Sequence, residues 1–266
     1  MRFFIGGYSS DLNIAWLEPE DGSIEIAGKV TTPENASFLR YVPELGTLYA
    51  TVETGYRMRE PGKIAAYRCD SSGKLTAIGS ASSCGTGPCH VDVDPRRKLV
   101  AAANYGGESF ALIRLREDGS LGEQLACVHH QGSSVNPSRQ AEPHPHATHF
   151  GPGGQFLYVC DLGIDKVLLY PVDELASGGG ASTGVVAAEL TPGSGPRHLT
   201  FSSDGTRAYL VNELSNDVVV YAVSGDDGTF EELQKASTLP PEFDGESTAA
   251  EIQLHPNGGF LYASNR

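Results

Sequence analysis

A strand-turn-strand unit occurs five times along this chain, and the repetition constrains the fold more than any other feature. Each copy holds an apolar strand, a tight turn and a second apolar strand that ends at a polar residue. The steps between equivalent residues are 52, 57, 51 and 53, counted along Tyr41, Val93, Phe150, Phe201 and Leu254. Repeats of this length are typical of propeller blades with four strands each. The sequence therefore predicts an all-β fold, a β-propeller.

Further alternating segments lie between the copies and predict the remaining strands of each blade. Third strands are expected over residues 63–68, 109–114, 166–170 and 217–222. Turns such as Asp118-Gly119 and Asp227-Gly228 follow, because Asp-Gly supplies the positive φ of a tight hairpin, and they lead to short outer strands. No helix longer than one turn is expected.

The last copy stops directly after its second strand, at Arg266. A propeller usually closes by pairing strands from its two ends, and Arg2-Phe3-Phe4-Ile5-Gly6 has the pattern of such a strand. We therefore expect residues 1–266 to form a single incomplete β-propeller domain, truncated at about five blades, with its C-terminal blades missing.

The charge balance excludes several classes of partner. There are 19 basic and 33 acidic residues, a formal net charge of −14. Such a protein repels phosphate backbones and acidic membrane surfaces, which argues against nucleic acid and membranes as partners. If it binds an anion, its few cations must gather at one place, so clustered Arg and His side chains gain weight.

The cysteines and the N-terminus predict a location. The five cysteines form an odd set without the spacing of a metal site, so we expect reduced thiols. The first residues lack the apolar run of a secretory signal, and no segment approaches the roughly 18 apolar residues of a membrane span. These observations predict a cytoplasmic protein.

Position within the repeat predicts where chemistry should occur. In a propeller the first strand of each blade lines the axial channel, so equivalent positions form rings around it. The start of the first strands reads Ser37, Cys89, His146, Arg197 and Ala250. The next position reads Phe38, His90, Ala147, His198 and Glu251. The end of the second strands reads Glu53, Tyr105, Leu162, Glu213 and Arg266. Because the two strands are antiparallel, these rings should share one mouth of the channel.

Charged side chains at this mouth suggest hydrolysis of an ester or lactone. That reaction needs a base to activate water and donors for the developing oxyanion. His146 or Glu213 is a candidate base, and Arg197 and Arg266 are candidate cations for an oxyanion or an anionic group. No Gly-x-Ser-x-Gly motif is present, which favours direct attack by water. A structural alternative is that Arg197 with Glu213, and Glu251 with Arg266, are ion pairs that lock blades together.

The run His144-Pro145-His146-Ala147-Thr148-His149 raises the possibility of a metal site. Along a strand His144 and His146 share one face and His149 points away, so at most two of the three bind together. No Asp or Cys at ligand spacing completes a site. We therefore predict no metal, with His149 packed between blades.

The segment Gly195-Pro196-Arg197-His198-Leu199-Thr200-Phe201 resembles the propeller-type lactonase family, which includes bacterial 6-phosphogluconolactonases. The likeness continues over nearly the whole chain, through Ala103-Asn104-Tyr105-Gly106-Gly107, Asn136-Pro137-Ser138-Arg139-Gln140, Tyr209-Leu210-Val211-Asn212-Glu213 and Ser264-Asn265-Arg266. It implies a seven-bladed propeller without an obligatory cofactor. Members of the family extend for roughly two more blades of this repeat size.

The resemblance also implies a function. It implies a hydrolase that converts 6-phosphogluconolactone to 6-phosphogluconate in the pentose phosphate pathway, with a small anionic lactone as its partner. The proposed site of a fungal relative, carboxymuconate lactonizing enzyme, is similar to His146, Arg197, Glu213 and Arg266, which are the expected catalytic residues. His90, His198, Glu251 and Asn212 are the expected substrate-binding residues.

Two other functions stay open from the sequence. One is a lactonase or cyclase that acts on another carboxylated lactone, such as a muconolactone, with the same residues. The other is a non-catalytic propeller that binds proteins, which would show an exposed apolar patch on one face. The sequence contains no signal for an oligomeric state.

Overall fold

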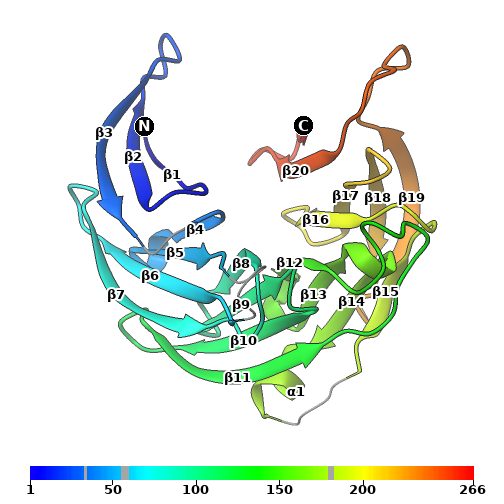
Figure 1. Cartoon of the computed structure of the whole chain (residues 1–266), viewed down its shortest axis with the longest axis horizontal. Helices are drawn as coiled ribbons and strands as arrows, with labels where there is room; N and C mark the ends of the chain where they lie inside the picture. Colours follow the sequence, from blue (N-terminus) through cyan, green and yellow to red (C-terminus); the bar gives the residue numbers. More distant parts are fainter. Residues whose placement is uncertain (33–34, 55–59, 179–182) are drawn as a thin grey trace. The chain divides into compact units, whose positions relative to one another are not determined.

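The structure, a computed structural model, describes residues 1–32, 35–54, 60–178 and 183–266. The chain divides into two compact units, Met1–Cys127 and Val128–Arg266. Within each unit, consecutive strands pair antiparallel to form separate sheets (Figure 1). The predicted all-β fold of four-stranded blades is confirmed, while the assignment of the whole chain to one domain stays a prediction.

The first unit contains one three-stranded sheet and two four-stranded sheets. The strands of the first sheet are β1 (Arg2–Ile5), β2 (Asp11–Leu17) and β3 (Ile24–Thr31). Those of the second are β4 (Leu39–Val42), β5 (Thr47–Val52), β6 (Lys63–Cys69) and β7 (Leu75–Ser82), with a 3-10 helix, η1 (Pro43–Leu45), in the turn. Those of the third are β8 (Pro88–Asp94), β9 (Leu99–Asn104), β10 (Ser109–Leu115) and β11 (Leu121–His129).

The second unit contains two four-stranded sheets and one strand pair. The first sheet holds β12 (Pro145–Phe150), β13 (Phe156–Asp161), β14 (Lys166–Pro171) and β15 (Val185–Glu189). The second holds β16 (Pro196–Phe201), β17 (Arg207–Asn212), β18 (Asp217–Val223) and β19 (Phe230–Ser237), and β20 (Ala249–Leu254) pairs with β21 (Leu261–Asn265). The short helices are η2 (Pro152–Gly154), η3 (Leu162–Ile164) and α1 (Val172–Ala176).

All five predicted hairpins are present, and so are the predicted third strands β6, β10, β14 and β18. The sequence did not predict β2 and β3; most residues of β3 are exposed, so its hydrophobic alternation is weak. The five residues of α1 slightly exceed the predicted limit of one turn, since a turn takes 3.6 residues.

A bulge recurs near the start of the inner strands β8, β12 and β16. The first residue of each inner strand pairs with the last residue of the following strand. The third residue of the inner strand pairs with the second-to-last residue of that following strand. The second residue therefore has no partner in the ladder, and this residue is Cys89, His146 or Arg197. Bulges commonly re-aim a side chain beside a functional site.

A backbone hydrogen bond recurs in all five hairpins. The first residue after each second strand donates its N–H to a carbonyl just before the inner strand, over 2.7 to 3.0 Å. The five donor and acceptor pairs are Glu53 and Asn35, Tyr105 and Gly87, Leu162 and His144, Glu213 and Gly195, and Arg266 and Thr248. Each bond holds the residue that follows the second strand beside the start of its own inner strand. This confirms that the repeat positions predicted to share one mouth of the channel lie at the same end of each hairpin.

Buried tyrosines join neighbouring sheets within each unit. Tyr158 of β13 is 1% exposed and donates its hydroxyl to Gly228 O, in the turn before β19, at 2.8 Å. Tyr49 of β5 makes the equivalent bond to Gly119 O at 2.7 Å. Around Tyr158, apolar side chains of the β12–β15 and β16–β19 sheets form one buried cluster. Burying a large apolar side chain contributes about 1.5–3 kcal/mol, so this shared cluster stabilises the packing of the two sheets.

The prediction that all five thiols are reduced is wrong for two of them. Cys84 and Cys127 form a disulfide within the first unit, with their Cα atoms 6.1 Å apart. Cys69, Cys89 and Cys160 are free thiols. Spacing along the sequence does not reveal such a pairing, because 43 residues separate the two cysteines and the fold alone brings them together.

The helices are too short to be membrane spans. Among the described residues, none is both long and apolar enough to cross a bilayer.

Candidate active site

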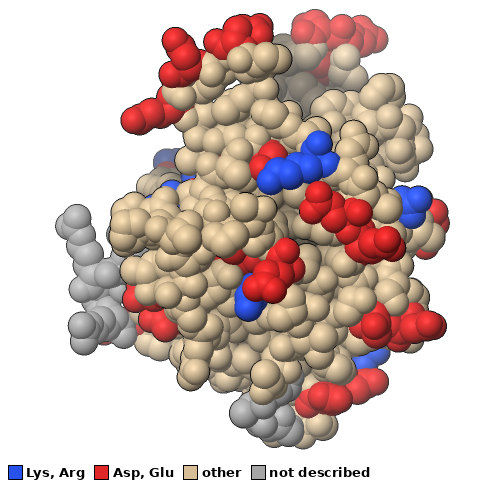
Figure 2. Space-filling model, turned by 90° about the vertical axis from the view of Figure 1, so that its right-hand side faces the viewer, with Lys and Arg blue, Asp and Glu red and all other residues tan. Residues whose placement is uncertain are grey.

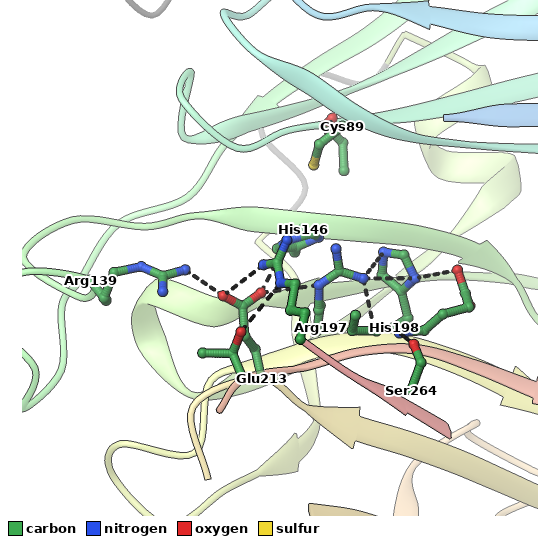
Figure 3. Close-up of polar contacts among 12 residues, drawn as sticks. Cys89, Arg139, His146, Arg197, His198, Glu213 and Ser264 are labelled. Carbon is green, nitrogen blue, oxygen red and sulfur yellow. Dashed lines mark hydrogen bonds and ion pairs between the residues drawn. The ribbon is translucent and has the colours of Figure 1, made fainter. Parts of the chain in front are cut away.

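A buried glutamate collects the charged side chains of the second unit. The Glu213 carboxylate is 0% exposed. Its Oε1 lies 2.6 Å from Arg139 Nη2 and 3.2 Å from Arg266 Nη2, and its Oε2 lies 3.0 Å from Arg197 Nε and 3.6 Å from His146 Nε2. Figure 3 shows the side chains of Arg139, His146 and Arg197 converging on this carboxylate. Three guanidinium groups therefore share one carboxylate.

Separate elements carry these residues to one place. His146 and Arg197 occupy the bulges of β12 and β16, and these two strands lie beside each other (Figure 1). Glu213 and Arg266 directly follow β17 and β21, where the recurring backbone bond holds them. The four predicted catalytic residues are thus brought together, although their roles stay predictions.

The arginines keep Glu213 ionised. Burial alone would raise its pKa, but the hydrogen bond from Arg139 and the charges of Arg139, Arg197 and Arg266 outweigh burial and lower the pKa below its ordinary value of 4.5. Glu213 is therefore a carboxylate with its oxygens occupied by donors. Such a group is a weak proton acceptor.

His146 is held in the neutral form. Burial lowers its pKa well below the ordinary value of 6.5, and the positive charge of Arg197 lowers it further. A neutral imidazole next to a carboxylate can accept a proton from water at neutral pH. Of the two candidate bases, His146 is thus the neutral one, whereas both oxygens of Glu213 already contact arginines.

A second group of contacts extends the cluster from Arg197. Its Nη1 donates to Ala250 O at 2.7 Å and lies 3.3 Å from His198 Nε2. His198 Nδ1 lies 3.2 Å from Glu251 Oε2. Burial is the main cause that lowers the pKa of His198. At Glu251 burial acts to raise the pKa, but hydrogen bonds, above all the one with His198, prevail and lower it to about 2.

Of the two ion pairs that the structural alternative predicted, only one is present. Arg197 does pair with Glu213, but Glu251 contacts His198, and Arg266 contacts Glu213. Three cations on one carboxylate exceed what a locking pair requires. The excess favours a site that receives another anion.

Two predicted substrate ligands, Asn212 and His90, have other contacts. Asn212, the last residue of β17, is 0% exposed and donates its amide to Asp217 Oδ1 at 2.7 Å. His90 belongs to β8 in the first unit, where its ring centroid lies 4.2 Å from that of Phe38. Their assignment as substrate ligands stays a prediction, as it does for His198 and Glu251, which the structure places in the cluster.

The repeat gave no indication of Arg139. This residue lies on the loop of residues 130–144 between β11 and β12, outside every repeat position. Two signals were available: the loop is long, rich in Gly, Ser, Pro and His, and leads directly into an inner strand, and its segment Asn136-Pro137-Ser138-Arg139-Gln140 is part of the family likeness. Only the fold shows that it carries a cation to Glu213.

The histidines of β12 have separate environments. His149 Nε2 accepts a hydrogen bond from Leu199 N of β16 at 3.2 Å, so the ring packs between two sheets as predicted. Within the described parts of the chain, no three His, Cys, Asp or Glu side chains are arranged to hold a metal ion.

The cluster remains accessible to solvent through its outer members. The side chains of Arg266 and Arg139 are 57% and 34% exposed, whereas that of Arg197 is 13% exposed. Acidic side chains outnumber basic ones on the face drawn in Figure 2, in keeping with the net charge of −14. A concentration of three arginines on such a protein provides a local attraction for anions.

A comparison with protein families decides the assignment. The model of the family described as "Lactonase, 7-bladed beta-propeller" matches residues 2–266. The chain belongs to this family. The blade repeat and the cluster at Glu213 are therefore features of a lactonase-family protein.

Similar proteins include several named for sugar lactones. A 6-phosphogluconolactonase of Bacillus subtilis is 34% identical over 206 residues, which cover 77% of this chain and 57% of the relative. A 6-phosphogluconolactonase of Formosa agariphila is 29% identical over 99% of this chain and 75% of the relative. The structure of a periplasmic gluconolactonase of Pseudomonas aeruginosa superposes with a TM-score of 0.89 and 32% identity, covering 100% of this chain and 76% of that one. The match to the Bacillus protein thus spans less than two thirds of that relative's length.

Proposed function

We propose that the protein hydrolyses a lactone that carries an anionic group, with 6-phosphogluconolactone as the substrate and 6-phosphogluconate as the product. The observation that carries this proposal is the convergence of Arg139, Arg197 and Arg266 on the buried Glu213, beside a neutral His146. The names of the Bacillus and Formosa relatives support the same substrate.

His146 is the proposed general base. Its neutral imidazole takes a proton from a water molecule as the water oxygen attacks the lactone carbonyl carbon. Glu213 lies 3.6 Å from His146 Nε2 and stabilises the imidazolium that forms. The lowered pKa of His146 keeps the base available below pH 6.5.

Arg197 is the proposed cation for the developing oxyanion. Its Nε and Nη1 are held by Glu213 and Ala250 O, so the guanidinium is fixed before the substrate arrives. A fixed charge in a largely buried position stabilises an oxyanion without reorganising in the transition state. Removal of one such donor typically lowers the rate by about 10²–10³-fold.

The second half of the reaction returns the proton. As the tetrahedral intermediate collapses, the bond between the carbonyl carbon and the ring oxygen breaks, and the imidazolium of His146 donates its proton to that oxygen. The ring opens to a hydroxy acid, which loses a proton to solvent. The sequence of steps consumes one water and requires no covalent enzyme intermediate or cofactor.

The predicted cytoplasmic location remains a proposal, and it has a direct test. A phosphorylated substrate supports it, whereas the disulfide between Cys84 and Cys127 is typical of oxidising compartments. Rapid thiol alkylation of intact cells would decide between the cytoplasm and an oxidising compartment. In a cytoplasmic protein, Cys84 and Cys127 should both be labelled without prior reduction.

The function is tested with freshly prepared 6-phosphogluconolactone. The wild-type rate should exceed spontaneous ring opening, and Arg197→Ala should lower kcat/KM at least about tenfold, or about 1.4 kcal/mol. Arg207→Ala is a matched control, because Arg207 is an exposed arginine of β17 whose Nη1 bonds to its neighbour Thr206 O. A wild-type rate equal to the spontaneous rate, or equal activity in Arg197→Ala, would refute the proposal.

A further inference from the structure

The two oxygens of Glu213 divide the cluster into two sides. Oε2 contacts Arg197 and His146, the proposed oxyanion cation and base. Oε1 contacts Arg139 and Arg266. Figure 3 likewise shows Arg139 and His198 on opposite sides of the Glu213 carboxylate. The side that contains two cations and no base is suited to binding a charged group, because its members do not take part in proton transfer.

Asp161 contacts both ends of the loop of residues 130–144, which carries Arg139. This carboxylate, 0% exposed at the end of β13, accepts at Oδ1 from His144 N at 2.8 Å and from Gly163 N at 2.9 Å. Its Oδ2 lies 2.6 Å from Nδ1 of the buried His130, and His130 Nε2 lies 3.0 Å from Tyr170 Oη. One side chain therefore holds residues 130 and 144, the first and last of the loop.

The interior of the loop is held as firmly. Gln140 is 0% exposed, donates to Leu162 O at 2.9 Å and accepts from Asn136 N at 3.2 Å. The chain passes so close to Gly163 that a Cβ there would lie 2.0 Å from Glu142 O. Arg139 thus projects from a preorganised loop, which lowers the entropy that binding would otherwise cost.

We propose that Arg139 determines specificity by binding the phosphate of the substrate, with Arg266 as the second cation. This inference rests on the proposed function, because it names the part of that substrate which the Oε1 side receives. A phosphate monoester carries a charge of about −1.5 to −2 at pH 7, which two guanidinium groups can match. A guanidinium has five donors in one plane, so contact with a carboxylate through Nη2 is compatible with contact to a second anion through another edge.

The charge count is consistent with such a ligand. Arg139, Arg197 and Arg266 carry three positive charges, Glu213 carries one negative charge, and His146 is neutral. Including Glu251, which contacts His198, leaves one positive charge in excess. An uncharged sugar lactone would not use this positive charge, whereas a phosphate would be attracted by it.

The kinetic test compares 6-phosphogluconolactone with glucono-δ-lactone. In Arg139→Gln, the ratio of kcat/KM for the phosphorylated lactone to that for the unphosphorylated one should fall at least about tenfold, chiefly through KM. Arg139→Lys keeps the charge and should recover part of the ratio. Arg207→Gln is the control and should leave the ratio unchanged, because it removes an exposed arginine of the same unit.

Binding of the products separates this inference from the proposed function. By calorimetry, Arg139→Gln should weaken 6-phosphogluconate at least about tenfold and gluconate by less. Should the wild-type protein bind 6-phosphogluconate through Arg139 but lack lactonase activity, the proposed function would fail and the inference would stand. An equal loss for both lactones, which would mean that Arg139 acts through Glu213, would overturn the inference, and so would an unchanged ratio.

Discussion

Glu53 and Glu213 occupy the same position in two repeats, yet their surroundings shift their pKa values in opposite directions. Each directly follows a second strand and donates its N–H to a carbonyl before the inner strand. Glu213 contacts three guanidinium groups, whereas Glu53 accepts a hydrogen bond from the Tyr8 hydroxyl at 3.4 Å. Burial accordingly raises the pKa of Glu53, while the arginines lower that of Glu213. The repeat determines where a side chain lies, and its neighbours determine its charge.

The largest expected effect separates these two carboxylates. Glu213→Gln should lower the free energy of unfolding by about 3–5 kcal/mol, because it leaves three guanidinium groups together without a counter-charge. Glu53→Gln should change it by less than about 1 kcal/mol, since an amide resembles a carboxyl group whose ionisation burial opposes. Denaturant unfolding of both variants measures the difference. Equal losses would remove the distinction between the two positions.

The next effect concerns the disulfide, which only the first unit contains. Replacing Cys84 and Cys127 by serine together should lower the free energy of unfolding by about 2–4 kcal/mol, because the bond closes a loop of 43 residues in the unfolded chain. Cys160 is the single cysteine of the second unit, so no equivalent bond is possible within it.

The free thiol of Cys69 provides the control for that experiment. Cys69→Ser should have little effect on unfolding, and a reducing agent should shift the wild-type midpoint toward that of the double variant. If the reducing agent leaves the wild-type midpoint unchanged, the disulfide does not stabilise the protein.

The smallest expected effect is on the pH dependence of the free energy of unfolding, to which the histidines near Glu213 and the carboxyl group of Glu53 contribute with opposite sign. The lowered pKa values of His146 and His198 mean that the unfolded chain takes up protons first, so stability falls as pH drops below about 6.5. Glu53 has a raised pKa, so the folded protein keeps its proton longer and stability falls as pH rises above about 4.5.

Unfolding measured at pH 4.5, 6 and 8 tests this contrast. The stability of Glu53→Gln relative to wild type should increase with pH over this range, because the variant has no carboxyl group to ionise. A difference that stays constant from pH 4.5 to 8 would show that Glu53 titrates as it does in the unfolded chain.

Much of the fold was predictable because it repeats. Alternation over the five copies was sufficient to find the hairpins and to align His146, Arg197, Glu213 and Arg266 at equivalent ends of their strands. The bulges were not predictable, since an extra residue in a strand changes pairing without changing composition. Arg139 was missed because its loop lies outside the repeat, and only tertiary contacts bring it to Glu213.

The partners of individual charges were the least predictable feature. The structural alternative paired Glu251 with Arg266, but the structure places Glu251 against His198 and Arg266 against Glu213. Equivalent positions in the repeat predict which residues lie near one another, whereas rotamers and neighbouring sheets determine which side-chain atoms are in contact. The disulfide was missed for the same reason, because cysteine spacing does not specify connectivity.

The recurring bulge has a consequence for how this scaffold can change. The bulges place His146 and Arg197 outside the regular register of β12 and β16, so a change of side chain at either position leaves the backbone pairing of these strands in place. A combinatorial library restricted to these two codons would therefore vary the binding chemistry of the cluster at Glu213 without changing the strand register. Within this architecture, divergence of substrate preference can proceed one blade at a time.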